Sequence, residues 1–246
     1  MTNLELSVSE GVRRIVLRRP PLNILTIDLM RELASALGAV EAGDRAVILS
    51  GAGKHFSAGA DVGEHLPPKG SEMMAALDEL FRALLSVPVP TLAAVRGACL
   101  GAGFELALGC DLIVAAETAR FGVPEIRLGV FAPIACALLP DSMAGAIARD
   151  LLFTGRELSG KEAGACGLAS RIAPEAELDA AAESLARHLG SLSVRALRTC
   201  KKGLGSGAAD RVSAAIRLYR ETTLQSPDAI EGLTAFLEKR SPVWKE

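Results

Sequence analysis

Twice in this chain a short apolar segment runs into a glycine-rich loop and then into a helical pattern. The first apolar segment covers residues 45–50 and leads into the loop at 51–61, and the second covers 91–95 and leads into the loop at 97–103. Short apolar runs that end in glycine turns and precede helices are typical of buried strands in an α/β fold. In such sheets ligands bind where the loops gather at the carboxyl ends of the strands, so we expect both loops beside one site.

Hydrophobic periodicity and turn residues divide the rest of the chain into further elements. Alternation predicts a hairpin of strands at 4–8 and 12–17, which the sequence PPLN at 20–23 ends. Further strands are predicted at 111–116 and 168–173, and helices at 27–41, 71–86, 103–110, 141–153, 159–166, 175–190, 193–203, 208–225 and 227–238. We therefore expect a mixed α/β core and a helical C-terminal third, with no low-complexity linker between them.

Composition and charge narrow the classes of function. Half of the 246 residues are hydrophobic, and the formal net charge is −2 with no block of Lys and Arg, so nucleic acid and anionic membranes are disfavoured as partners. The five cysteines and three histidines are widely spaced. We interpret the cysteines as small buried hydrophobes in a reducing compartment and expect no metal site. The N-terminus has no signal pattern and no apolar run reaches the length of a membrane span, which favours a cytoplasmic protein.

Three nucleotide-binding or nucleophile motifs are incomplete or absent. Gly53-Lys54 resembles the end of a P-loop, but Ile48 stands where the first glycine belongs and His55 replaces Ser or Thr. Gly101-Ala-Gly103 fails the dinucleotide-binding fingerprint because Leu106 occupies the position of the third glycine. The chain contains no G-x-S-x-G sequence of a serine hydrolase.

Two glutamates stand in surroundings that are otherwise small or apolar. Glu105 lies in GACLGAGFELALGCDLIVAA (97–116), and Glu125 lies in RFGVPEIRLGV (120–130). Burying a carboxylate is costly unless it is paired or its pKa rises. Singly, each glutamate could cap a helix or pair with an arginine. Together with two loops that expose backbone N–H groups, the pair favours general acid and general base catalysis beside an oxyanion hole.

These residues resemble the crotonase, or enoyl-CoA hydratase/isomerase, superfamily over almost the whole chain. GKHFSAGADV is similar to the first oxyanion loop of the family, and RGACLGAGFELALGCDLIVAA is similar to the second. ARFGVPEIRLGV, LLFTGRELSGKEAGACGLASRI and EGLTAFLEKRSPVW match three further blocks in the family's order and spacing. Five blocks in order make the resemblance specific.

The resemblance implies an α/β fold in which ββα turns wind into a spiral. Residues 1–173 would form this spiral with the active site and the site for coenzyme A, and residues 174–246 the C-terminal helical region. It also implies an acyl-CoA thioester substrate, a homotrimer or dimer of trimers, and no cofactor, because coenzyme A enters as part of the substrate.

The resemblance also assigns site residues by position. Ala60 and Ala102 would donate their backbone N–H groups to the oxyanion, and Glu105 and Glu125 would be the catalytic pair. We favour Glu125 as the proton donor to carbon and Glu105 as the base for water. The residues that would contact coenzyme A are Ala58, Asp61, Val62 and Lys239, the last one from a neighbouring subunit.

Two stretches depart from the family's usual pattern. In GAGFE, Ala102 replaces the middle glycine, which is acceptable only where that residue has a negative φ. After RLGV, the sequence FAPIACALLP replaces a glycine-rich segment, so Phe131, Pro133 and Ile134 are expected to wall the acyl pocket. With PPLNIL, this stretch is most similar to the branch that hydrates cyclohexa-1,5-diene-1-carbonyl-CoA in the degradation of aromatic acids.

Other readings stay open at this point. A straight-chain enoyl-CoA hydratase of fatty acid β-oxidation, a double-bond isomerase, a thioester hydrolase and a non-catalytic homologue that binds coenzyme A or RNA share much of the pattern. The retained second glutamate disfavours the isomerase, and the low net charge disfavours an RNA-binding role. His55 and His65 are expected as solvated loop residues and Asp61 as a residue that orders its loop. Tyr219 and Trp244 are expected to pack at a subunit or lobe contact.

Overall fold

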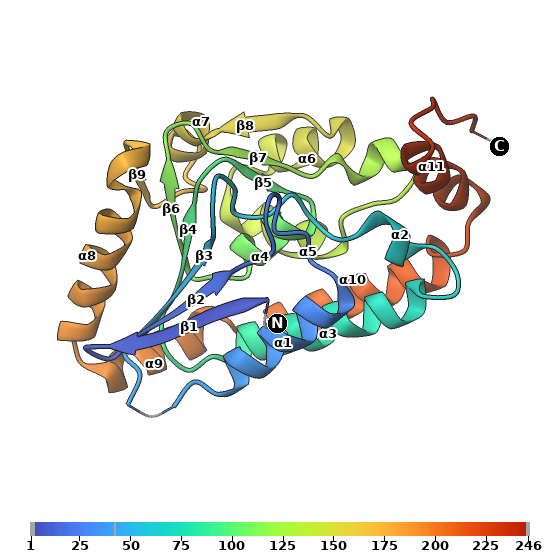
Figure 1. Cartoon of the computed structure of the whole chain (residues 1–246). Coiled ribbons are helices and arrows are strands. Elements are labelled where there is room, and N and C mark those ends of the chain that lie inside the picture. The colour runs from blue at the N-terminus through green and yellow to red at the C-terminus, as the bar shows by residue number, and fades with distance from the viewer. Residues whose placement is uncertain (1–2, 42, 245–246) are drawn as a thin grey trace.

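A six-stranded sheet forms the larger part of the core in the computed structural model, which describes residues 3–41 and 43–244. The strand order is β1-β2-β3-β4-β6-β9 (Figure 1). All neighbouring strands run parallel except the β1–β2 hairpin. The strands of this sheet are β1 Leu4–Ser9, β2 Val12–Leu17, β3 Ala46–Gly51, β4 Thr91–Val95, β6 Leu112–Ala116 and β9 Arg171–Ala173.

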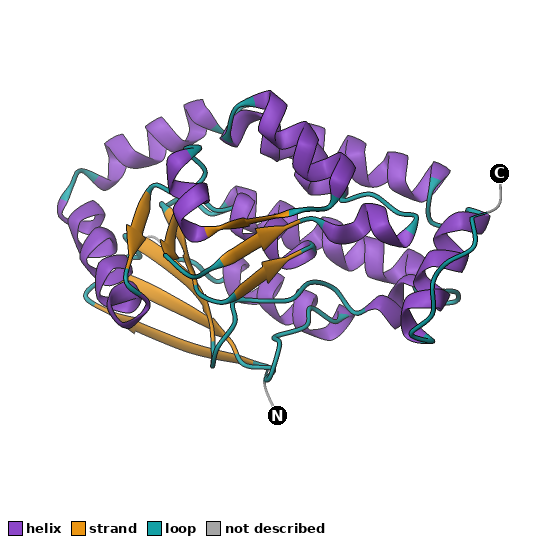
Figure 2. Ribbon diagram, turned by 90° about the horizontal axis from the view of Figure 1, so that it is seen from above, coloured by secondary structure: helices purple, strands orange, loops and turns teal. Residues whose placement is uncertain are grey.

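A second sheet of three short strands lies against the first one (Figure 2). It has the order β5-β7-β8, with β5 Ala98–Leu100, β7 Arg120–Gly122 and β8 Glu157–Ser159. The chain passes from β4 to β5 and then into a helix, and from β6 to β7 and then into another helix. Each such unit places one strand in each sheet, so the chain winds through repeated ββα turns.

Helices cover both faces of the large sheet and extend past its carboxyl edge. They are α1 Ile27–Gly38, α2 Val62–His65, α3 Gly70–Ser86, α4 Ala102–Leu108, α5 Pro133–Ser142, α6 Gly145–Thr154, α7 Gly160–Ala165, α8 Leu178–Ser191, α9 Val194–Leu204, α10 Ala208–Thr222 and α11 Pro227–Leu237, with 3₁₀ turns η1 Pro124–Leu128 and η2 Glu175–Glu177. Helix α8 packs across β3, β4 and β6, and α4 packs against β4 on the side of the second sheet.

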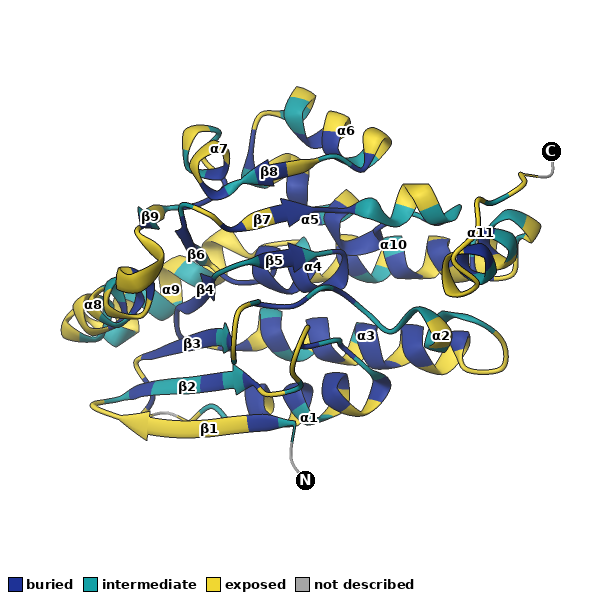
Figure 3. Ribbon diagram, turned by 45° about the horizontal axis from the view of Figure 1, so that its top comes forward, coloured by how far each residue is buried: buried dark blue, intermediate teal, exposed yellow. Residues whose placement is uncertain are grey.

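The burial of each strand follows its sequence. The apolar runs of β3, β4 and β6 are almost entirely buried, as expected for parallel strands covered on both faces (Figure 3). Strand β1 instead has an exposed outer edge, and all its residues except Leu4 are exposed. The core is therefore centred on the parallel strands, and the site lies beyond their carboxyl ends.

Most predicted elements are confirmed, with four corrections. The glycine loop expected at 97–103 contains a strand, β5, and strands β7 and β8 were not expected at all. The helix expected at 141–153 is α6, which begins at Gly145, and helix α5 before it, Pro133–Ser142, was not expected. The cysteines were expected to be buried, but Cys136 and Cys200 are exposed because they face outward on α5 and α9.

The C-terminal helices return to the carboxyl end of the sheet. Helix α10 packs against α3 and α5, and α11 packs against α2 and η1. These contacts place residues from the last thirty positions beside loops from the first half of the chain (Figure 1). Within the described part of the chain, every helix is too short or too polar to span a lipid bilayer.

Candidate active site

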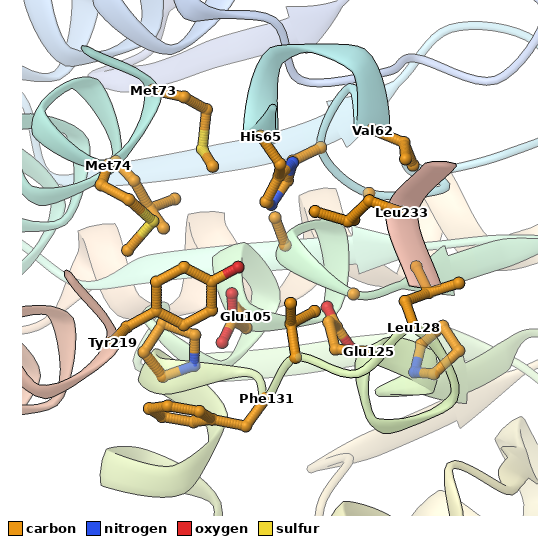
Figure 4. A pocket seen from close by; sticks show the side chains of 18 of the residues that line it. Val62, His65, Met73, Met74, Glu105, Glu125, Leu128, Phe131, Tyr219 and Leu233 are labelled. Atoms are coloured by element: carbon orange, nitrogen blue, oxygen red, sulfur yellow. The ribbon is translucent and has the colours of Figure 1, made fainter. Parts of the chain in front are cut away.

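A cavity of about 330 Å³ lies between the two glycine-rich loops, α3 and the C-terminal helices (Figure 4). Most of its wall is apolar, and the acidic side chains that face it are Glu105 from α4 and Glu125 from η1. Both loops, the segment after η1, α10 and α11 contribute residues to the wall. A largely apolar cavity with a few convergent polar groups is the usual form of a small-molecule site.

Glu105 is held by the start of another helix. Its Oε1 atom accepts hydrogen bonds of 2.9 Å from the backbone N–H groups of both Ile134 and Ala135, in the first turn of α5. Those N–H groups have no partner inside their own helix, so the carboxyl group satisfies them. Burial raises the pKa of Glu105 to about 7, against the lowering effect of the two hydrogen bonds. Both of these hydrogen bonds go to Oε1, so they hold one oxygen of the carboxyl group.

Glu125 lacks such support. Its Oε2 atom is buried and has no hydrogen-bond partner among the described residues. Burial and the nearby charge of Glu105 together raise the pKa of Glu125 to about 8. The carboxyl group therefore tends to keep its proton at neutral pH.

Glu105 and Glu125 can take different roles, one as acid and one as base, because their surroundings differ. Both pKa values are raised into the neutral range, and the two hydrogen bonds to Glu105 favour its ionised form while its charge favours the protonated form of Glu125. One carboxylate and one carboxylic acid then face the same cavity. This state suits a reaction that takes one proton from a substrate or water and delivers another.

Asn23 fixes the shape of the first glycine-rich loop. It is fully buried with φ of +50°, a conformation that asparagine tolerates better than most residues. Its side-chain oxygen accepts from the N–H of Arg19, and its amide donates to the carbonyls of Ala52 and His55. The Ser57 hydroxyl then donates to the carbonyl of Asn23. The PPLN sequence therefore ends the strand and also, through Asn23, holds the loop that borders the cavity by hydrogen bonds.

The two loops meet at their glycines. A Cβ atom on Gly59 would lie 3.1 Å from the Leu100 carbonyl oxygen and 3.7 Å from the Ala102 nitrogen. A Cβ atom on Gly101, whose φ is +53°, would lie 2.6 Å from Oε1 of Glu125. The absence of side chains at both positions therefore lets the loops approach each other and the glutamate.

This contact brings two backbone N–H groups to the cavity wall. Leu25 donates to the carbonyl of Gly59 and accepts from the N–H of Asp61, so the N–H of Ala60 points the other way. Ala102 begins α4, whose first i→i−4 bond runs from Glu105 to Gly101, so the N–H of Ala102 has no partner within the helix. Ala102 is helical and the positive φ falls on Gly101, which is how the GAGFE sequence is accommodated.

Not every residue that the sequence assigns to the site lines the cavity. Ala58, Ala60, Val62 and Ala102 do so, as do Phe131 and Pro133. The side chain of Ile134 does not line it and is fully buried, and this residue instead contributes the N–H that holds Glu105.

Asp61 caps α2 by accepting from the N–H groups of Gly63 and Glu64. Lys239 lies beyond α11, on the exposed C-terminal segment and outside the cavity wall.

The structure corrects the expectation for both histidines. Nδ1 of His55 accepts from the N–H of Ala98 and so joins the two loops. His65 lines the cavity, its Nδ1 lies 3.0 Å from the Asp61 carbonyl oxygen, and burial lowers its pKa. Neither is the solvated loop residue that we expected. The described residues include no cluster of His, Cys, Asp and Glu that could hold a metal ion.

Tyr219 is the site residue that the sequence analysis missed. Its ring, from α10, lines the cavity and packs on Phe131 with ring centroids 5.3 Å apart. A polar aromatic residue on the apolar face of a helix was the only signal, and it also fits an ordinary packing contact. Trp244 lies next to Gly129, at the end of η1, and is half exposed.

A family model described as enoyl-CoA hydratase/isomerase matches residues 7–246. The chain is 42% identical over 238 residues to the cyclohexa-1,5-dienecarbonyl-CoA hydratase of Thauera aromatica, covering 94% of this chain and 92% of that protein. It is 37% identical to a probable enoyl-CoA hydratase of Bacillus subtilis, covering 100% and 99%. The structure matches an enoyl-CoA hydratase from Mycobacterium avium subsp. paratuberculosis with a TM-score of 0.89 and 28% identity, covering 100% and 99% of the two chains. The chain belongs to the enoyl-CoA hydratase/isomerase family and has its fold.

Proposed function

We propose that the protein adds water to an α,β-unsaturated acyl-CoA thioester, or removes it from the hydrated product. The observation that carries this proposal is the pair of buried carboxyl groups in one cavity, with pKa values raised to about 7 and about 8. Family membership and the names of the relatives support the same reaction. Isomerisation would need only one carboxyl group to carry a proton between two carbons, so it would leave the second one without a role.

The mechanism assigns a step to each group. The N–H groups of Ala60 and Ala102 hold the thioester oxygen and stabilise the negative charge that develops on it. Glu105 accepts a proton from water while the water oxygen bonds to the β carbon and the π electrons move toward the carbonyl. Glu125 then gives its proton to the α carbon. The two glutamates exchange protonation states, and the proton returns to Glu125 before the next turnover.

For the acyl group we propose a compact ring, a cyclohexadienecarbonyl thioester. Phe131 and Pro133 wall the cavity where the sequence departs from the usual glycine-rich segment, and a flat ring suits such a wall better than a long chain. The relative from Thauera aromatica, which is named for a substrate of this kind, supports this choice. The runner-up is a straight-chain enoyl-CoA.

We also propose the assembly that the resemblance implies, a homotrimer or a dimer of trimers. Phe236, Leu237 and Trp244 lie on α11 and the segment after it, and each exposes about half of its surface. Burying such side chains against a second copy would be favourable. In this arrangement Lys239, which is exposed beside them, would reach the phosphates of coenzyme A bound to a neighbouring subunit.

The test follows the absorbance of the conjugated thioester. Cyclohexa-1,5-diene-1-carbonyl-CoA and crotonyl-CoA are offered separately to the wild-type protein and to the Glu105→Gln and Glu125→Gln variants. Loss of the band with the cyclic substrate, slowed by each substitution about 10²–10⁴-fold, supports the proposal. The variant Glu79→Gln, which alters an exposed glutamate of α3, should keep the wild-type rate. Faster turnover of crotonyl-CoA would replace the ring with a straight chain, and no turnover of either thioester would contradict hydration.

A further inference from the structure

The Tyr219 hydroxyl is buried in the cavity and has no partner in the part of the chain that the structure describes. The residue exposes only 2% of its surface, and its oxygen has no hydrogen bond to any described residue. Figure 4 shows the hydroxyl turned toward the side of the cavity where the carboxyl groups of Glu105 and Glu125 lie. Buried hydroxyl groups are nearly always hydrogen-bonded, so this one calls for a partner that enters the cavity.

The surroundings of Tyr219 agree with this placement. Burial, together with the charges of Glu125 and Glu105, raises the pKa of Tyr219 above its usual range, so the hydroxyl keeps its proton as a donor. Its ring is fixed against Phe131, and α10 is held by its packing on α3 and α5. The hydroxyl therefore has a defined direction before any ligand binds.

The proposed substrate offers few possible partners. Its thioester oxygen is assigned to the N–H groups of Ala60 and Ala102, where the two glycine loops meet. A cyclohexadiene ring or an alkenyl chain has no other polar atom. The oxygen that is added or removed is the remaining candidate, and it must lie beside both glutamates because they exchange protons around it.

We propose that the Tyr219 hydroxyl donates a hydrogen bond to the oxygen of the reacting water and to the same oxygen once it is the hydroxyl group of the product. This inference rests on the hydratase function proposed above. Tyr219 keeps its own proton throughout, because Glu105 takes the proton from water and Glu125 supplies the proton to carbon. Its role is to hold the water at the β carbon.

The proposal predicts a particular split of the kinetic constants in Tyr219→Phe. In the enoyl complex the contact is made to the water and not to the thioester, so it affects how the water is placed and not how tightly the enoyl thioester binds. In the complex with the hydroxyacyl thioester the same contact is made to the bound molecule itself. In hydration kcat should fall with KM unchanged, and in dehydration KM should rise with kcat unchanged. The factor should be about three- to tenfold, the worth of one neutral hydrogen bond, and equal in both directions because the overall equilibrium is fixed.

A binding measurement tests the contact without turnover. Pivaloyl-CoA and 3-hydroxypivaloyl-CoA differ by one hydroxyl group, and neither has an α hydrogen, so neither can lose water. Titration calorimetry measures the affinity of both ligands for wild type and for Tyr219→Phe. The four affinities form a double-mutant cycle between the ligand hydroxyl group and the Tyr219 hydroxyl group. The preference of the wild type for the hydroxylated ligand should shrink about three- to tenfold in the variant. Glu79→Gln, which alters an exposed glutamate of α3, is the control and should retain the preference.

The outcomes separate this inference from the proposed function. An unchanged ligand preference in Tyr219→Phe, or a lower affinity for the enoyl thioester alone, would overturn the role of the hydroxyl even if the enzyme is a hydratase. A lost preference in a protein that hydrates neither thioester would support the contact and reject the hydratase. Because the hydroxyl has no partner among the described residues, Tyr219→Phe should melt no lower than wild type. A clearly lower melting temperature would assign Tyr219 a structural role instead.

Discussion

Glu105 and Glu125 face one cavity but differ in what holds them. Oε1 of Glu105 accepts two backbone N–H groups from α5, whereas the buried Oε2 of Glu125 accepts none from the described residues. Those hydrogen bonds favour the ionised form of Glu105, and its charge in turn favours the protonated form of Glu125. The asymmetry of the pair therefore originates in the position of the first turn of α5.

The pH dependence of the reaction should reflect this pair. We expect a bell-shaped profile of kcat/KM with limbs near 7 and 8, because activity needs Glu105 ionised and Glu125 protonated. Below the first limb Glu105 gains a proton, and above the second Glu125 loses one. Initial rates at low substrate concentration, measured across both limbs, give the profile. The two apparent pKa values describe the coupled pair and not either glutamate alone. A rate that stays constant through this interval would contradict the assignment.

The same pKa shifts predict how stability depends on pH. Glu125 has a folded-state pKa of about 8 against 4.5 for an ordinary glutamate, so the folded protein holds a proton that the unfolded chain loses. Its contribution to stability is complete below the unfolded value and is lost as pH rises through the folded value. Glu125→Gln should therefore raise the free energy of unfolding, relative to wild type, more at pH 9 than at pH 4, with about 5 kcal/mol as the upper bound.

Denaturant unfolding of wild type and Glu125→Gln at both pH values measures this difference. Glu79→Gln, on the exposed face of α3, serves as the control and should give nearly the same effect at both. If Glu125→Gln were less stable than wild type at pH 9, the ionised carboxyl group would have a stabilising partner in the folded protein.

Gly101 should be required for activity, whereas Gly53 should matter only for the conformation of the backbone. Both have positive φ, but a Cβ on Gly101 would lie 2.6 Å from Oε1 of Glu125, whereas a Cβ on Gly53 would meet nothing within 4 Å. Gly53→Ala should lose about 1 kcal/mol of stability from backbone strain and keep its activity. Gly101→Ala has the same strain but also displaces Glu125, and its kcat/KM should fall about 100-fold or more. Thermal unfolding and initial rates distinguish the two, and equal activities would show that Glu125 tolerates displacement.

The parts of the fold that the sequence predicts are those with long patterns. The apolar runs of β3 and β4 and the helical periodicity of α3 and α11 each extend over enough residues to identify the element. Strands β5, β7 and β8 have three residues each, too few for a pattern. Helix α5 is apolar around much of its surface and contains Pro140, so its periodicity is weak.

The site residues also divide into those that the sequence predicts and those that it does not. Glu105 and Glu125 stand out because each breaks a local apolar pattern, and the loops stand out through their glycines. The place of Tyr219 in the cavity depends on how α10 packs against α3 and α5, which no local pattern encodes. The same holds for Ile134, whose contribution is a backbone N–H rather than its side chain.

Asn23 should be the most sensitive position outside the cavity, because its buried side chain makes three hydrogen bonds, two to the first loop at Ala52 and His55 and one to the N–H of Arg19. Asn23→Ala should lower the free energy of unfolding by about 2–4 kcal/mol, since it leaves buried backbone groups unpaired and places alanine at positive φ. Asn23→Gly removes that strain but not the unpaired groups, and should recover about 1 kcal/mol. Asn3→Ala, which removes a contact with Glu32 at the partly exposed start of β1, is the control and should lose less than about 1 kcal/mol. Denaturant unfolding measures all three, and an Asn23→Ala protein as stable as the control would mean that the loop keeps its shape without this side chain.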